Sequence, residues 1–199
     1  MNIKSFVPNA LTLLNLFFGL IALVLVFNKE YPLAFLAVCI GIVFDFFDGF
    51  AARMLQVQSK LGVELDSMAD MVTSGVVPGT VMFFLLMESL GIQLSDYSNI
   101  SSSNISQLWV PLVGFAITLA SGYRLAKFNI DDRQTSLFIG LPTPANSLMI
   151  TGLVFLVQED LGLISELLKS TWFLLLITLI SSYLLNANFY LFSLIVQQQ

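Results

Sequence analysis

The hydrophobic residues of the chain fall into long runs separated by short polar stretches, and the lengths of these runs predict the architecture. Six apolar runs cover roughly residues 8–28, 31–55, 66–90, 107–128, 143–158 and 171–196. A helix needs about 20 apolar residues to cross the hydrocarbon core of a bilayer. The pattern therefore predicts an all-α integral membrane protein with about six transmembrane helices. The last run is either one long helix or a helix broken near Asn186 and Asn188.

The connections and the composition indicate one membrane domain without a soluble module. Residues 91–106 are rich in Ser and Asn, which predicts a solvated loop between the third and fourth spans. Of the 199 residues, 57% are hydrophobic and only 11% are charged, far outside the usual composition of soluble domains. We expect a single transmembrane domain over residues 1–199 and no nucleic-acid partner.

The first apolar run carries polar residues that a cleaved signal peptide would not need. Asn9, Thr12 and Asn15 interrupt its apolar face, and no small-residue cleavage site follows it. We expect this run to be kept as a membrane helix.

The basic residues of the short loops predict the orientation in the membrane, because Lys and Arg favour the cytoplasmic side. Under the six-span prediction, only Lys29 and Lys169 lie on one side. The other side, which we expect to face the cytoplasm together with both termini, carries Lys4, Arg53, Lys60, Arg124, Lys127 and Arg133.

Two neighbouring helices are predicted to bring acidic side chains together within this apolar chain. At 100° per residue, Asp45, Asp48, Gly49 and Ala52 share one face of the second helix. Gly62, Asp66 and Asp70 share one face of the third. The short connection makes the two helices antiparallel neighbours, so that four carboxylates converge near the cytoplasmic boundary.

These carboxylates need positive charge, because an acid in hydrocarbon costs several kcal/mol. The chain has no His and eight Lys plus Arg, and Arg53 is the one basic residue within the first acidic cluster. Interhelical salt bridges would require more cations than this region holds. Oxygen ligands favour Mg²⁺, Mn²⁺ or Ca²⁺, and two such ions sharing carboxylates can clamp a diphosphate. The lack of His also excludes Ser-His and Cys-His nucleophile pairs.

The spacing of the acids and small residues resembles the signature of the CDP-alcohol phosphotransferase family. That pattern reads Asp45-x₂-Asp48-Gly49-x₂-Ala52-Arg53-x₈-Gly62-x₃-Asp66-x₃-Asp70, with all eight fixed residues present. The resemblance implies the family's fold of six transmembrane helices, a homodimer and a cavity open to the cytoplasm. It also implies two divalent cations, Mg²⁺ or Mn²⁺, a CDP-linked lipid donor and release of CMP.

The resemblance implies a role for each matching residue. Asp45, Asp48, Asp66 and Asp70 are expected to bind the metals, and Asp70 is also the expected general base. Residues expected to contact the CDP-diacylglycerol donor are Asn9, Thr12, Gly49, Ala52, Arg53, Ser59 and Gly62. Weaker candidates for binding serine or phosphate are Arg124, Lys127 and Asn129; ordinary positive-inside charge explains Arg124 and Lys127 equally well.

Within the family, residues 58–72, 120–129 and 138–145 are similar to membrane-embedded phosphatidylserine synthases. The similarity implies a membrane enzyme, a CDP-diacylglycerol–serine O-phosphatidyltransferase, that converts CDP-diacylglycerol and L-serine to phosphatidylserine and CMP. A bacterial inner membrane, with its lipids around the protein and the active site facing the cytoplasm, is the expected location. Many synthases of this type continue through a further pair of helices beyond the point where this chain stops.

Two alternatives remain at this point. One is another CDP-alcohol phosphotransferase, of the phosphatidylglycerophosphate or phosphatidylinositol-phosphate type, whose phosphorylated acceptor would need more cations near the cavity. The other is a divalent-cation transporter, which would need polar residues continuing across the membrane. Residues 33–42 and 81–86 are nearly all apolar, which favours an enzyme.

Overall fold

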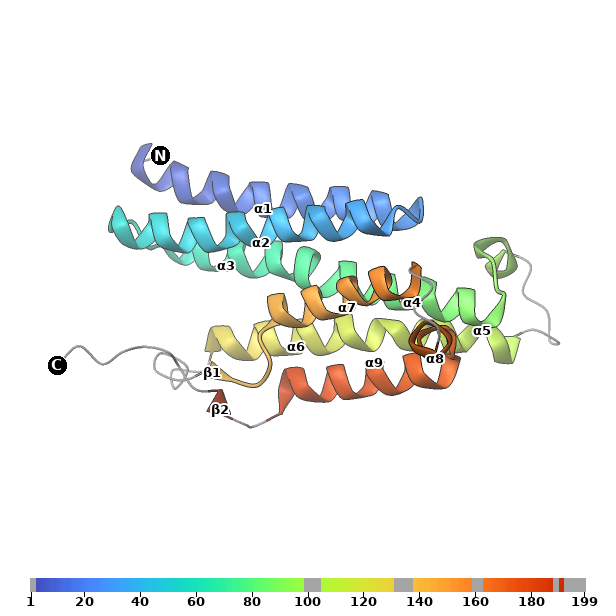
Figure 1. Cartoon of the computed structure of the whole chain (residues 1–199). Helices are drawn as coiled ribbons and strands as arrows, with labels where there is room; N and C mark the ends of the chain where they lie inside the picture. The colour runs from blue at the N-terminus through green and yellow to red at the C-terminus, as the bar shows by residue number, and fades with distance from the viewer. Residues whose placement is uncertain (1–2, 99–104, 131–137, 159–162, 188–189, 192–199) are drawn as a thin grey trace.

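The chain is almost entirely helical, and its helices fall where the apolar runs predict them (Figure 1). The computed structural model describes residues 3–98, 105–130, 138–158, 163–187 and 190–191. The first two helices are α1 (Ile3–Phe27) and α2 (Tyr31–Met54). The third apolar run is one continuous helix made of α3 (Lys60–Asp70), the π-helical segment η1 (Met71–Val76) and α4 (Val77–Leu90).

The second half begins with the 3₁₀ turn η2 (Leu94–Tyr97). The fourth run is α5 (Ile105–Leu112), the 3₁₀ turn η3 (Val113–Phe115) and α6 (Ala116–Ile130). Then follow β1 (Phe138–Ile139), α7 (Thr143–Gln158), α8 (Leu163–Lys169), α9 (Thr171–Asn186) and β2 (Tyr190–Leu191).

The helix lengths confirm an all-α integral membrane protein. In the described part of the chain, Ser5–Phe27, Tyr31–Met54, Lys60–Leu90 and Gln107–Ile130 are long and apolar enough to cross a membrane. Helices α7 and α9 match the fifth and sixth runs but have 16 residues each. The total of six spans therefore stays a prediction.

Several predicted boundaries are wrong. Helix α1 begins at Ile3, so that Pro8 lies inside the helix, and the third helix begins at Lys60, six residues before the apolar run. For the last run, the alternative of a break near Asn186 is confirmed: α9 ends at Asn186, and Tyr190 and Leu191 pair antiparallel with Ile139 and Phe138. The connection over 91–106 includes the η2 turn as well as loop.

The long third helix lies at the centre of the molecule. Figure 1 shows α1 and α2 side by side along α3, with α6, α7 and α9 forming a second group around α4. Every residue from Val77 to Met87 is buried, as expected for a helix that is apolar on all sides. The beginning of α1, the end of α2, the beginning of α3 and the end of α6 share one end of the molecule (Figure 1).

The π-helical segment is stabilised by hydroxyl groups of neighbouring helices. Ser147 Oγ of α7 donates to the Thr73 carbonyl at 3.1 Å, and Thr118 Oγ1 of α6 donates to the Gly75 carbonyl at 3.0 Å. Close packing supports these bonds, since a Cβ built on Gly79 would collide with Thr118 Oγ1. Gly75 and Gly79 form a Gly-x₃-Gly pair, and such pairs allow a neighbouring helix, here α6, to approach closely.

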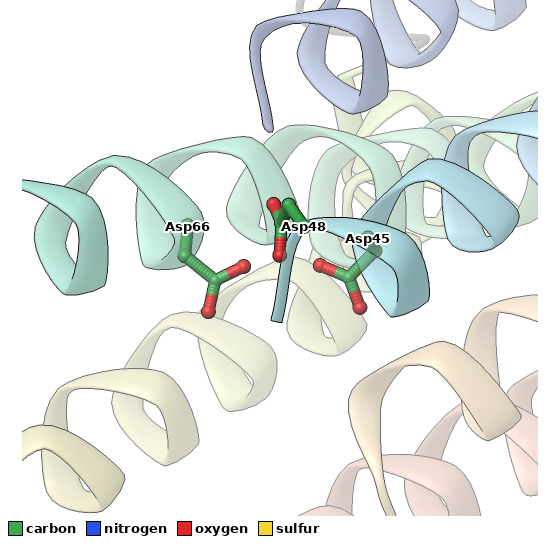
Figure 2. Close-up of side chains that lie close together, drawn as sticks. All are labelled: Asp45, Asp48 and Asp66. Atoms are coloured by element: carbon green, nitrogen blue, oxygen red, sulfur yellow. The ribbon is translucent and has the colours of Figure 1, made fainter. Parts of the chain in front are cut away.

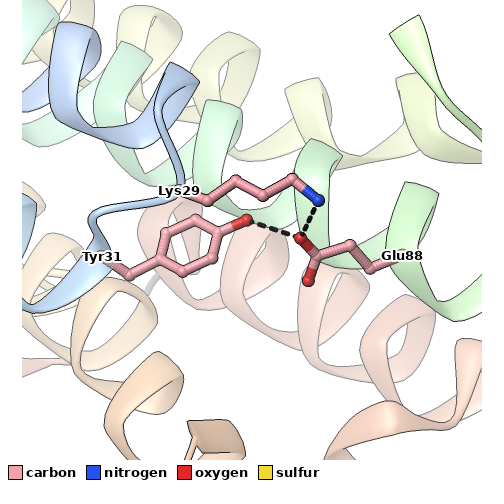
Figure 3. A network of polar contacts seen from close by, with 3 residues as sticks. All are labelled: Lys29, Tyr31 and Glu88. Carbon is pink, nitrogen blue, oxygen red and sulfur yellow. Dashed lines mark hydrogen bonds and ion pairs between the residues drawn. The ribbon is translucent and has the colours of Figure 1, made fainter.

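At the end of the molecule away from the beginning of α3, Glu88 forms a salt bridge with Lys29 (Figure 3). Lys29 Nζ lies 2.8 Å from Glu88 Oε1, and the Tyr31 hydroxyl donates to the same oxygen at 3.1 Å. These contacts join the α1–α2 turn to the end of α4.

Candidate metal centre and adjoining pocket

Three of the four predicted aspartates meet between α2 and α3. Asp45, Asp48 and Asp66 each offer one carboxylate oxygen, and these oxygens lie within 4.8 Å of one another. Figure 2 shows the three side chains turned toward a common space. The periodicity explains the meeting, because the acids share one face of each helix and the helices run antiparallel.

The connection between α2 and α3 keeps Asp66 in register with the two acids of α2. Ser59 is the N-cap of α3, and its Oγ accepts a hydrogen bond from the Gly62 backbone N–H at 3.0 Å. Such a cap satisfies an amide that the first turn of a helix leaves without a partner. The cap therefore defines where α3 begins, and with it the turn on which Asp66 lies.

The fourth aspartate, Asp70, lies one turn farther along the helix and is joined to the others by an amide. Asn15 Nδ2 of α1 is 3.3 Å from Asp45 Oδ1 and 3.3 Å from Asp70 Oδ1. Asp70 is thus next to Asp45, although it is not one of the three residues whose oxygens lie within 4.8 Å.

Helix α1 also contacts the third acid of the group. Thr12 Oγ1 is within hydrogen-bonding distance of Asp48 Oδ2 and of the Pro8 carbonyl, 3.1 Å away. Asp48 is only 5% exposed. Thr12, predicted as a nucleotide contact, therefore also orients a candidate metal ligand.

A pocket of about 660 Å³ opens beside the acids. Asp48 and Asp66 form part of its wall. All seven residues predicted to contact the donor also line it, namely Asn9, Thr12, Gly49, Ala52, Arg53, Ser59 and Gly62. Their role in binding stays a prediction, but helices α1, α2 and α3 bring them to one cavity.

Small residues keep the pocket wall open. A Cβ built on Gly49 would meet only Arg53 Nη2, at 3.9 Å. At Gly62 it would approach Ser59 Oγ to 3.3 Å and Asn9 Oδ1 to 3.5 Å, so that a larger residue would crowd the pocket. Arg53 itself is exposed and lines the pocket.

The three weaker candidates on α6 lie beyond this wall. Arg124 is 8% exposed, its Nε donates to the Leu141 carbonyl at 2.7 Å, and its charge interacts with Asp70. Asn129 exchanges hydrogen bonds with Ser67 of α3, with its Nδ2 3.0 Å from Ser67 Oγ. Lys127 is half-buried. Phe128, between the latter two, is the residue of α6 that lines the pocket.

The charges of the site are suited to binding a cation. The hydrogen bonds to the aspartates described above come from the neutral side chains of Thr12 and Asn15. Within the described residues, none of these aspartates forms a salt bridge with Lys or Arg. A group of three convergent carboxylates can bind a metal ion, and oxygen donors suit hard divalent cations.

Some residues of the site escaped the sequence prediction. In the sequence, Asn15 is visible only as an interruption of an apolar face, although its spacing after Asn9 and Thr12 places it along one stripe of α1. Ser67 carried no signal beyond its position next to Asp66. The remaining additions line the pocket: Pro8, Val57, Gln58, Lys60, Val63 and Phe128.

Comparison with known proteins agrees with this site. Residues 5–191 match the family model described as CDP-alcohol phosphatidyltransferase. Over 155 residues, 76% of each chain, the sequence is 31% identical to a CDP-diacylglycerol–serine O-phosphatidyltransferase of Bacillus subtilis. A protein of that name from Methanocaldococcus jannaschii is 31% identical over 156 residues, 78% of this chain and 63% of its own.

A third relative shows how much longer some of these proteins are. A protein with the same name from Mycobacterium tuberculosis is 28% identical over 159 residues. The match covers 76% of this chain and 50% of the mycobacterial one. The chain therefore spans between half and three quarters of the length of these relatives.

Proposed function

The chain belongs to the CDP-alcohol phosphatidyltransferase family, and from this we propose that it transfers the phosphatidyl group of CDP-diacylglycerol to L-serine. The products are phosphatidylserine and CMP. The relatives described above bear the name of this activity at 28–31% identity.

One observation carries the proposal: the acids converge at the wall of a pocket that the donor-binding candidates line. Asp48 and Asp66 belong both to the three-carboxylate group and to the pocket wall. A diphosphate bound in the pocket would therefore lie beside the cation ligands, with Arg53 and Lys60 available to its negative charge.

Asp45, Asp48, Asp66 and Asp70 would hold two Mg²⁺ or Mn²⁺ ions. When bound, such ions neutralise a diphosphate and stabilise a leaving phosphate oxygen. The protein contributes the positions of the carboxylates, held by Thr12 and Asn15, and a pocket shaped by Gly49 and Gly62.

In the proposed reaction the serine hydroxyl oxygen attacks the phosphorus that carries the diacylglycerol. A new P–O bond forms to serine, and the P–O bond to CMP breaks. Asp70 accepts the hydroxyl proton, and CMP leaves with the bonding electron pair. Phosphoryl transfer depends mainly on positioning and charge stabilisation, so that a weak base suffices.

Arg124 is the best candidate for binding the serine carboxylate. It is a buried cation whose charge interacts with Asp70, the proposed base. A guanidinium can bind a carboxylate through two parallel hydrogen bonds. Asn129 and Lys127 are the further candidates on the same helix.

The packing of α4 argues against cation transport. A transporter needs a polar path from the acids to the far side of the membrane. Residues Val81, Met82, Phe83, Phe84, Leu85, Leu86 and Met87 are all buried and apolar along this helix. This stretch of the central helix therefore contributes no polar group to such a path.

The proposal includes a location and an assembly. Arg53, Lys60, Arg124 and Lys127 lie on elements at the pocket end of the molecule (Figure 1), which supports a cytoplasmic active site under the positive-inside rule. A bacterial inner membrane and a homodimer complete the proposal.

A panel of acceptors tests the activity. The purified protein is incubated with CDP-diacylglycerol, Mn²⁺ or Mg²⁺, and L-serine, glycerol 3-phosphate or inositol phosphate in parallel. We expect CMP release and a lipid product with serine. A product with a phosphorylated acceptor and none with serine would assign the chain to another branch of the family.

A further inference from the structure

The side-chain amide of Asn15 lies at the junction of three helices behind the acidic group. The residue is fully buried in α1, and its one NH₂ group faces two carboxylates, Asp45 of α2 and Asp70 of α3, at 3.3 Å each. The amide nitrogen therefore spans the space between a member of the three-acid group and the more distant fourth acid.

The orientation of this amide follows from its neighbours. Asn15 Oδ1 is buried without a hydrogen-bond partner among the described residues, which normally costs about 1–3 kcal/mol. The opposite orientation would place that oxygen against two carboxylates. The acids thus determine which way the amide faces, and the unpartnered oxygen is the consequence.

The backbone of Asn15 is held from the other side. Thr73 Oγ1 of η1 donates to the Asn15 carbonyl at 3.1 Å, and Ser147 Oγ of α7 donates to the Thr73 carbonyl at 3.1 Å. Hydrogen bonds therefore lead from α7 through the π-helical segment to α1, and from there to the acids.

Glycines leave the space that Asn15 and Thr73 occupy. A Cβ built on Gly41 of α2 would lie 3.0 Å from Asn15 Oδ1 and 3.0 Å from Thr73 Cγ2. A Cβ on Gly19 of α1 would collide with Thr73 Oγ1. Any larger residue at 41 would displace Asn15 without changing a polar group of the site.

We propose that Asn15 is a positioning residue, which holds the Asp45 and Asp70 carboxylates at the separation needed to bind divalent cations. Two like charges would otherwise move apart or turn toward other donors. Groups that orient metal ligands in this way typically contribute 10–100-fold to metal affinity. The inference rests on the proposed function only in requiring a cation site at these acids.

Binding of Mn²⁺ alone to the full chain in detergent tests this inference. Electron paramagnetic resonance of free Mn²⁺ measures the Kd, and no lipid or serine is present. We expect Asn15→Leu, which keeps the volume but removes the donors, to raise the Kd about tenfold or more. Asn28→Leu, at an exposed position directly after the end of α1, is the control and should leave the Kd unchanged.

A second pair of variants retains the amide. Gly41→Ala should raise the Kd by a smaller factor, about threefold to tenfold, because its Cβ would press on Asn15 and on Thr73, which holds the Asn15 carbonyl. Its control is Gly152→Ala, where a Cβ meets only Phe35 Cε2 at an ordinary 3.5 Å. If Asn15→Leu gives no monodisperse protein, the comparison of Gly41→Ala with Gly152→Ala tests the inference instead.

The outcomes separate positioning from mere packing. A packing role would lower the unfolding temperature in EDTA while the folded protein kept its Mn²⁺ affinity. A Kd within twofold of the wild type in folded Asn15→Leu, or in folded Gly41→Ala if Asn15→Leu is not obtained, overturns the inference. So does a wild-type chain that binds no Mn²⁺. A chain that binds Mn²⁺ normally but makes no phosphatidylserine would refute the proposed activity alone.

Discussion

Carboxylates at the two ends of the central helix, residues 60–90, have different polar partners. At the far end, Glu88 is paired with Lys29 at 2.8 Å and accepts a hydrogen bond from Tyr31 (Figure 3). At the pocket end, Asp66 lies near Asp45 and Asp48 (Figure 2). The neutral side chains of Thr12 and Asn15 donate hydrogen bonds to Asp48, Asp45 and the neighbouring Asp70. One acid in a salt bridge contrasts with several acids that, within the described residues, form none.

This difference in partners separates an acid with a structural role, Glu88, from the acids that are candidate metal ligands. Glu88 is partly exposed, joins the α1–α2 turn to α4, and has its counter-charge in the same chain. Carboxylates gathered without such a partner repel one another, which is tolerable when a bound cation supplies the missing charge. The pocket end is therefore the candidate site for an external cation, whereas Glu88 at the far end already has a counter-charge in Lys29.

The largest effect is expected from removing one acid of the pocket end. Asp66→Asn should lower CMP release about 10³-fold or more, because metal ions supply several kcal/mol of charge stabilisation. The same change should raise the unfolding temperature in EDTA, because it relieves repulsion among the carboxylates. Kinetic assays and thermal unfolding in detergent measure the two effects.

Glu64→Gln provides the control for Asp66→Asn. Glu64 is exposed on the same helix, outside both the acidic group and the pocket wall. The Glu64→Gln variant should leave both CMP release and the unfolding temperature in EDTA unchanged. If Asp66→Asn kept full activity, the contrast between the two ends would lose its functional meaning.

A smaller effect, on donor binding, is expected from filling the pocket. The wall at Gly49 is open, so that Gly49→Leu should be tolerated by the fold. Its side chain should raise the KM for CDP-diacylglycerol about tenfold, equivalent to about 1.4 kcal/mol of binding. Gly152→Ala is again the control, and an unchanged KM for the donor would mean that the nucleotide binds elsewhere.

The two arginines near the pocket end should affect different substrates. Arg124→Lys loses the planar fork and should raise the KM for serine about fivefold to tenfold, with the donor KM within twofold. Arg53→Lys should show the reverse pattern, because Arg53 lines the donor pocket. Steady-state kinetics with each substrate varied in turn decides, and equal effects of both variants on both KM values would contradict the assignment.

The smallest effect is expected at the far end. Glu88→Gln should reduce stability by about 1 kcal/mol, through loss of a partly exposed ion pair and a weaker bond from Tyr31. That corresponds to about 2–4 °C in a chain of this size. CMP release should stay within twofold, whereas abolished turnover would place this end within the catalytic machinery.

Much of the site was predictable because helical periodicity is a local property. The spacing of Asp45 and Asp48, and of Asp66 and Asp70, places each pair on one face of its helix before any packing is known. The contribution of Asn15 was not predictable in this way. Its partners belong to two other helices, and Asp45 and Asp70 lie 30 and 55 positions away in the chain.

The backbone irregularities could not be predicted either. The π-helical segment Met71–Val76 depends on hydroxyl donors of α6 and α7, which lie far along the chain. The end of α9 at Asn186 is also a tertiary matter, since Asn186 Nδ2 donates to the Ala120 carbonyl and β2 pairs with β1. An apolar run alone carries no information about such partners.

The sequence by itself determined the apolar spans, the two acidic faces and the small residues beside them, because each depends on spacing along one or two adjacent helices. The tertiary structure decided that α1 closes the group with Thr12 and Asn15, and that the donor-binding candidates form one pocket. It also decided that Glu88 forms a salt bridge with Lys29, whereas the aspartates form none within the described part of the chain. Those outcomes depend on which helices pack together, and packing joins residues that are distant in the chain.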